Sequence, residues 1–163
     1  MNTEDIRLLY RYNAWANMRI LNAAALVPGA QFLAPAGFPH GGLRSTLTHI
    51  LFAEWVWRKR WEGDSPTTTI EPEDFPTFES IRDRWRNEDE SLDAFLDNIN
   101  DARLNTELEY KSTKGEPKRN VLWQLMAHLV NHGTQHRTEA AALLTDMGHS
   151  PGDIDLILFL REG

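Results

Sequence analysis

The sequence predicts an all-α protein, a four-helix bundle with a short C-terminal helix. Four long segments repeat their apolar residues every three or four positions, which is the period of one helix face. The stretches between several of these segments are rich in Pro and Gly, as loops are. The chain has 163 residues, of which 41% are hydrophobic, and this is enough for one domain with a buried core. We therefore expect residues 1–163 to form a single domain.

The first part of the chain predicts two helices separated by a long loop. Thr3 is a candidate N-cap for a helix over residues 3–27, which ends at Pro28. Residues 28–42 contain three Pro and four Gly, so we expect a loop, and loops of this length are often functional. The second helix is expected over residues 43–61, with apolar residues on more than one face.

The second part of the chain predicts two more long helices and two smaller elements. Residues 64–77 are rich in Pro, Thr and acidic residues and predict a loop, and residues 78–100 predict the third helix. Alternating residues and a Lys-Gly-Glu-Pro turn over 104–119 predict a short β-hairpin or an irregular crossover. The fourth helix is expected over 120–147, and a closing helix over 154–160. Four amphipathic helices bury their apolar faces most simply as a bundle.

The charge and the cysteine count exclude several classes of function. The net charge is −7, which disfavours binding to nucleic acid, and no basic stripe is visible. The absence of Cys excludes disulfides, thiolate metal sites and a Cys nucleophile. No segment predicts a membrane span or a signal peptide, so a cytoplasmic protein is expected. Six His remain as the main candidate metal ligands.

Two histidines lie on the predicted core face of the fourth helix. His132 and His136 are four residues apart, so both rings project from one face and can reach one metal ion. His49, in the apolar middle of the second helix, is the best candidate for a third ligand. His128 lies one turn before His132 and could be a fourth ligand, a supporting residue or a core residue. The alternative interpretation is a pair of buried, hydrogen-bonded histidines without a metal.

Other polar residues on the inner helix faces are candidates for a pocket near such a metal. Asn13 and Asn17 share a face of the first helix, where packing or capping is the alternative role for each. Glu54 lies on the inner face of the second helix, where a carboxylate must be paired or near a metal. Arg137 is a candidate ion-pair partner of His136. We expect the two remaining histidines, His40 and His149, to be exposed to solvent.

Three parts of the chain resemble the DinB/YfiT-like family of metalloenzymes. They are residues 9–17 (LYRYNAWAN), residues 47–50 (LTHI) with Glu54 and Trp57, and residues 128–137 (HLVNHGTQHR). The resemblance covers nearly the whole chain and implies a four-helix bundle with a long crossover connection. It also implies a homodimer and a divalent metal held by His49, His132 and His136, whereas His128 matches a histidine that is not a usual ligand. Thr138 and Glu139 depart from the Gly-Gln pair of many members.

The resemblance also implies a class of activity. Relatives include thiol transferases that use bacillithiol or mycothiol and a mycothiol-dependent maleylpyruvate isomerase. The leading hypothesis is therefore a metal-dependent transferase that joins a low-molecular-weight thiol to a small-molecule substrate, or a related detoxification enzyme. Three neutral imidazoles leave coordination positions open, and zinc is the first candidate metal, with nickel or iron as alternatives. The competing hypotheses are a non-catalytic, damage-inducible stress protein that binds metal and acts through a partner, and a metal-free bundle.

Overall fold

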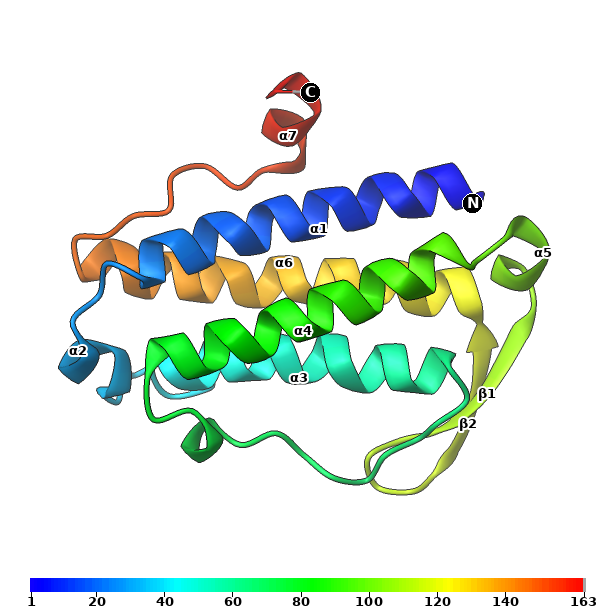
Figure 1. Cartoon of the computed structure of the whole chain (residues 1–163), viewed down its shortest axis with the longest axis horizontal. Coiled ribbons are helices and arrows are strands. Elements are labelled where there is room, and N and C mark those ends of the chain that lie inside the picture. The colour runs from blue at the N-terminus through cyan, green and yellow to red at the C-terminus, as the bar shows by residue number, and fades with distance from the viewer. Residues whose placement is uncertain (163) are drawn as a thin grey trace.

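Four long helices lie side by side in the computed structural model, which describes residues 1–162 (Figure 1). The long helices are α1 (Thr3–Ala24), α3 (Leu43–Trp61), α4 (Phe78–Asp97) and α6 (Leu122–Asp146). The smaller elements are α2 (Gly29–Leu33), a 3₁₀ turn (Pro72–Asp74), α5 (Asp101–Leu104), the strands β1 (Glu107–Lys111) and β2 (Pro117–Val121), and α7 (Leu156–Glu162). The structure thus confirms the predicted all-α bundle and closing helix, and it adds α2 inside the predicted loop 28–42.

The order of the helices requires one long crossover. Helices α3 and α4 run in the same direction, opposite to α1 and α6, so residues 62–77 travel back along the bundle between them (Figure 1). The predicted hairpin forms after α5, with Glu107 opposite Val121 and Lys111 opposite Pro117. It projects from the end of the bundle where α3 finishes (Figure 1). This placement brings the hairpin beside the last turns of α3.

Local sequence signals set the helix ends. Asn2, rather than the predicted Thr3, caps α1: its side chain accepts from the backbone N–H of Asp5, whose carboxylate accepts from the N–H of Asn2. Gly148 follows α6 with φ of 82°, a conformation that glycine adopts without a steric penalty. The N–H of His149 then reaches the carbonyl of Leu144 at 2.8 Å and closes the helix end.

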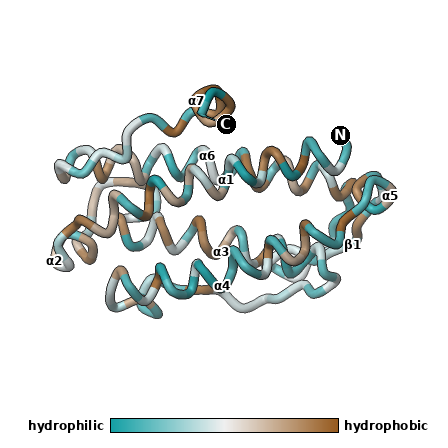
Figure 2. The backbone as a smooth tube through the Cα atoms, turned by 45° about the horizontal axis from the view of Figure 1, so that its top comes forward, coloured by the Kyte–Doolittle hydropathy of each residue, from teal (hydrophilic) through white to brown (hydrophobic). Residues whose placement is uncertain are grey.

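The core consists of two apolar halves with a polar layer between them. One half gathers residues from the beginning of α1 and α6, and the other gathers residues from the end of α1 and the beginning of α3. Apolar and polar positions alternate along each long helix (Figure 2). Where the halves meet, the bundle buries polar side chains, namely Asn13, Asn17, Glu54, Glu88, His136 and Arg137. Buried polar groups require partners, so this layer is where a functional site is expected.

None of the helices in residues 1–162 combines the length with the apolar composition that crossing a membrane requires.

Candidate metal centre

Four histidines from three segments meet at one side of the polar layer. His40 comes from the loop before α3, His49 from α3, and His132 and His136 from α6. The rings of His40 and His49 stack with centroids 3.9 Å apart, and the ring of His136 lies 4.4 Å from those of both His49 and His132. We call these four residues the histidine cluster. The bundle therefore brings together all three sequence-predicted ligands and one histidine that was not predicted.

The nitrogen atoms of the cluster lie close enough to share one ion. One ligand nitrogen from each of His40, His49 and His136 lies within 4.8 Å of the other two. The Nε2 atoms of His49 and His132 are 3.1 Å apart. Two of the predicted ligands, His49 and His136, thus belong to the close triad, while His132 approaches it through His49. The complete ligand set stays a prediction that metal-binding variants can test.

The sequence interpretation placed two histidines wrongly, because His40 and His149 are partly buried rather than exposed. His149 packs at the end of α6, where its N–H bonds to the carbonyl of Leu144. His40 is half-buried because its loop folds back onto the start of α3. A bridge between Phe38 and Gly41 tightens the loop, and Gly42 lies so close to the carbonyl oxygen of Ala34 that a Cβ atom would come within 2.1 Å of it. The Gly41-Gly42 pair after His40 was the sequence signal for a close approach of two backbone segments. The spacing of apolar residues, on which the prediction of the helices depended, does not indicate distances across a loop.

The environment favours the neutral imidazole at His40, His49 and His132. Burial, followed by the neighbouring imidazoles of His40, His136 and His132, lowers the pKa of His49 to about 3. Burial and the nearby His136 and His128 lower the pKa of His132 to about 4. The pKa of His40 is also lowered, first by burial. A neutral imidazole keeps a free lone pair, which is the form that binds a metal.

A carboxylate orients one ring of the cluster. The Nδ1 atom of His136 lies 2.9 Å from Oε2 of Glu139, one turn later on α6. This contact corrects the expectation that Arg137 pairs with His136. When Nδ1 carries the proton and donates it to Glu139, the lone pair of His136 is on Nε2, the arrangement typical of metal-binding histidines.

The predicted pocket residues instead form a buried network in the bundle interior. The side-chain amides of Asn13 and Asn17 donate to Oε1 of Glu54 at 2.6 and 2.7 Å, and their carbonyl oxygens accept from Nη1 of Arg137 at 2.6 and 2.9 Å. Burial raises the pKa of Glu54, whereas these amide bonds and the charge of Arg137 oppose that effect. We call these four residues the core network. Two amides thus join a buried acid to a buried base.

A cavity of about 340 Å³ lies beside the histidine cluster. Its walls include His49 and His132 from the cluster, Trp57 from α3, and Tyr110 and Lys118 from the hairpin. Asn13, Asn17 and Glu54 are 2% exposed and do not belong to this lining. The volume is typical of a site for a small molecule. His128 is exposed, and its ring lies 5.4 Å from Trp57 and 5.7 Å from His132, outside the close triad.

The donor chemistry fits a divalent cation. The close approach of the His49 and His132 Nε2 atoms is favourable if one nitrogen is protonated or if a cation attracts both lone pairs. Imidazole nitrogens are common ligands of zinc, nickel and iron in proteins. The cluster can therefore hold a divalent metal through neutral nitrogen donors, next to a cavity that admits a small molecule.

Comparisons with known proteins match nearly the whole chain. A family model described as the DinB family matches residues 1–162. The chain is also similar to Protein DinB of Bacillus subtilis (strain 168), with 25% identity over an alignment of 163 positions that covers 94% of this chain and 94% of that protein. The family match includes the segments that contribute His40, His49, His132 and His136.

Proposed function

This chain belongs to the DinB family, and we propose that it is a divalent-metal-dependent enzyme that transfers a low-molecular-weight thiol to a small electrophilic molecule. The observation that supports the proposal most directly is the position of the histidine cluster. Its neutral nitrogen donors adjoin a cavity of about 340 Å³ with His49 and His132 in the wall. Donors that meet beside a cavity suit a catalytic metal, whereas a structural metal is usually enclosed by its ligands.

Zinc is the metal that we propose first, with nickel and iron as alternatives that imidazole ligands also accept. When bound, such a cation lowers the pKa of a thiol and so provides a thiolate nucleophile near neutral pH. The chain contains no Cys, so the reacting thiol has to come from a second small molecule.

The residues of the chain would bind and orient the reactants. Glu139 holds the ring of His136 through Nδ1, which directs the other nitrogen of the ring into the cluster. Phe52, Val56 and Trp57 supply apolar surface to the cavity, and this surface limits the water around a bound electrophile. Holding two reactants together in one small cavity raises their effective concentration.

A conjugation assay tests this proposal. Bacillithiol, mycothiol, glutathione and coenzyme A are each mixed with a model electrophile and with metal-loaded protein, chelator-treated protein or the variant His136→Ala. We expect metal-loaded protein to accelerate conjugation of at least one thiol, and both altered samples to lose that acceleration. His128→Ala is the matched control, because it removes an exposed imidazole from the same helix.

The same assay separates catalysis from simple metal binding. Equal slow rates with all three samples and every thiol would contradict the transferase and favour a metal-binding stress protein that acts through a partner. A cytoplasmic homodimer that binds small molecules and no nucleic acid is part of our proposal. Light scattering tests the dimer directly, and a particle with the mass of one chain would contradict it.

A further inference from the structure

A buried cation at the other end of the cavity from His49 has no carboxylate partner in the described part of the chain. Arg60, near the end of α3, is 6% exposed. Within residues 1–162, no carboxylate pairs with its guanidinium, and its Nε atom is buried without a hydrogen-bond partner. The guanidinium lies over the rings of Trp57, at 4.6 Å, and Tyr110, at 5.6 Å. The two rings compensate part of the cost of burying this charge, and an anionic ligand can supply the partner that the chain does not.

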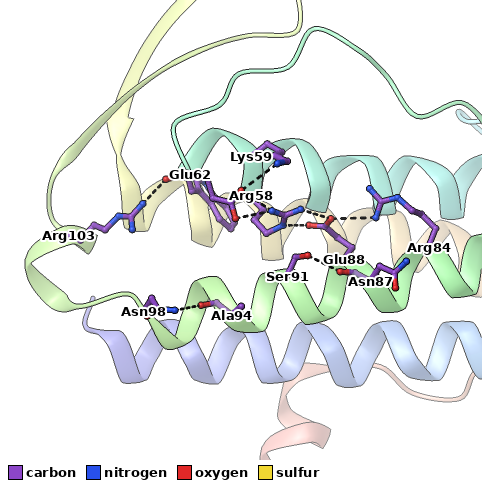
Figure 3. A network of polar contacts seen from close by, with 11 residues as sticks. Arg58, Lys59, Glu62, Arg84, Asn87, Glu88, Ser91, Ala94, Asn98 and Arg103 are labelled. Carbon is purple, nitrogen blue, oxygen red and sulfur yellow. Dashed lines mark hydrogen bonds and ion pairs between the residues drawn. The ribbon is translucent and has the colours of Figure 1, made fainter.

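The contrast with Arg58 shows that the fold pairs a buried arginine where one is structural. Arg58 lies two residues earlier on α3 and is also 6% exposed. Its Nε and Nη2 atoms donate to the two carboxylate oxygens of Glu88 at 2.5 and 2.9 Å, and its Nη1 atom donates to Glu62 (Figure 3). Burial lowers the pKa of Arg60, as expected for a cation that faces no carboxylate.

Arg60 lines the same cavity as His49 and His132. Eleven residues separate His49 from Arg60, which is about three helical turns, so both lie on one face of α3 with their Cα atoms about 16 Å apart along the axis. Between them the wall is formed by apolar and aromatic side chains, including Phe52, Val56 and Trp57. A ligand that reaches both ends is therefore elongated, with an apolar middle and an anionic end.

We propose that Arg60 binds a carboxylate of the small molecule that occupies the cavity. The planar guanidinium can donate two parallel hydrogen bonds to a carboxylate, and the ring of Trp57 fixes its plane. Lys118, the other cation of the cavity wall, pairs with Glu116 at 3.0 Å, so Arg60 is the cation of the wall that has no carboxylate partner. One such guanidinium matches one carboxylate, whereas a phosphate dianion would require more cationic donors. This proposal extends the proposed function, because the opposite end of the ligand would react at the histidine cluster. The carboxylate site itself requires only Arg60 and the cavity.

A binding experiment tests the site without any enzymatic activity. A fluorinated phenylacetate is titrated into metal-loaded and chelator-treated protein and followed by fluorine NMR, with the neutral amide and the phenyl phosphate analogue as comparisons. We expect the carboxylate to bind both forms of the protein, and the amide to bind about ten-fold more weakly, because a charged hydrogen-bonded pair is lost. Equal binding of acid and amide, or tighter binding of the phosphate, would overturn the proposal.

Two variants assign the effect to Arg60. Arg60→Gln is expected to weaken carboxylate binding about ten-fold. Lys59→Gln removes the same charge from a neighbouring residue that pairs with Glu62 and does not line the cavity, so it should bind as the unmodified protein does. A change of less than two-fold in Arg60→Gln would contradict the proposal. Arg60→Lys keeps the charge and should bind the carboxylate more tightly than Arg60→Gln. If Arg60→Gln folds poorly, the carboxylate affinity of Arg60→Lys is compared with that of the unmodified protein instead.

Metal content separates this inference from the proposed function. We expect Arg60→Gln to keep the full metal content of the unmodified protein, because its side chain is not part of the histidine cluster. If the protein binds no metal or transfers no thiol, the proposed function fails while the carboxylate titration with chelator-treated protein still decides the role of Arg60.

Discussion

The core network and the histidine cluster are both polar regions that include residues of α3 and α6, but their contacts differ in kind. In the core network, the amides of Asn13 and Asn17 turn one face to Glu54 and the other to Arg137. Acid and base therefore compensate each other inside the protein. In the histidine cluster, imidazoles face imidazoles, with ring centroids as close as 3.9 Å.

This difference separates a structural role from a functional one. A buried acid and a buried base that are joined through shared amides compensate each other within the protein, and Oε2 of Glu54 and Nε of Arg137 are the atoms of the pair without a partner within residues 1–162. Each neutral imidazole has a nitrogen with a free lone pair. When such imidazoles face each other, one bound cation can accept the lone pairs of several rings. The core network should therefore control stability, and the histidine cluster should control metal binding.

The largest expected effect is the loss of metal binding in the histidine cluster. His49→Ala and His136→Ala each remove a ligand that both the sequence and the close triad include, so each should abolish stoichiometric binding of zinc or nickel. The relative losses in His40→Ala and His132→Ala then decide the third ligand. Metal analysis after dialysis measures all four variants, with His128→Ala as the control that keeps its metal. Full metal content in His49→Ala or His136→Ala would contradict the assignment.

The second effect tests the core network. Arg137→Met leaves Glu54 without its base in the interior, so the free energy of unfolding should fall by about 3–5 kcal/mol. Urea unfolding of chelator-treated protein measures this change. His132→Ala is the comparison from the same helix, and it should cost much less stability because His132 is only half-buried. If His132→Ala destabilised the protein as much as Arg137→Met, the claim that stability depends on the core network more than on the histidine cluster would be wrong.

The two regions also show how far the sequence could predict the site. Helical spacing placed His132 and His136 on one inner face and identified His49, Asn13, Asn17 and Glu54 as inward-facing, because periodicity determines the face of a helix. It could not assign the partners of those residues. Pairing depends on how helices distant in sequence meet, and the structure shows the packing alternative for the two amides, which bond to Glu54 and Arg137.

Loops and the hairpin were the parts that the sequence predicted least well. His40 enters the histidine cluster because of a backbone approach between Gly42 and Ala34, for which the sequence has no periodic signal. The wall formed by Tyr110 and Lys118 depends on where the hairpin lies against α3, which strand alternation does not specify. By contrast, α3 itself spans the predicted residues 43–61, because its boundaries follow from local sequence signals.

A smaller effect is expected at the point where the core network touches the backbone of α6. Gly133 lies beneath Arg137, and a Cβ atom there would be 2.7 Å from Nη1 of Arg137 and 3.1 Å from Oδ1 of Asn13. Gly→Ala in a helix usually stabilises, but here the guanidinium is held by its hydrogen bonds and cannot move freely. We expect Gly133→Ala to lower the free energy of unfolding by about 1–2 kcal/mol.

The control for Gly133 is another helical glycine with free space around it. Gly29, in α2, has no atom within 4 Å of the position that an alanine Cβ would occupy, and its φ is not positive. Gly29→Ala should therefore be neutral or stabilise by about 0.4–1 kcal/mol. Urea unfolding of both variants provides the comparison. If Gly133→Ala were as stable as Gly29→Ala, Arg137 would be less firmly held than the core network requires.

The smallest expected effect is the part of the pH dependence of stability that comes from the histidine cluster. It is measured as the difference between the unmodified protein and His132→Ala, because burial also raises the pKa of Glu54 and of Asp89. The pKa values of His49 and His132, about 3 and about 4, lie below the value of about 6.5 for a free histidine. The unfolded chain therefore binds more protons than the folded one, and the stability of metal-free protein should fall as pH drops from about 6.5 to about 4. The effect is modest because both rings are partly exposed.

The same pKa values should keep metal affinity higher at pH 5 than three free imidazoles would allow. Unfolding curves and chelator competition measured at several pH values test both expectations, and His132→Ala should show a weaker dependence of stability on pH. A pH profile unchanged in that variant would mean that the cluster does not hold its imidazoles neutral.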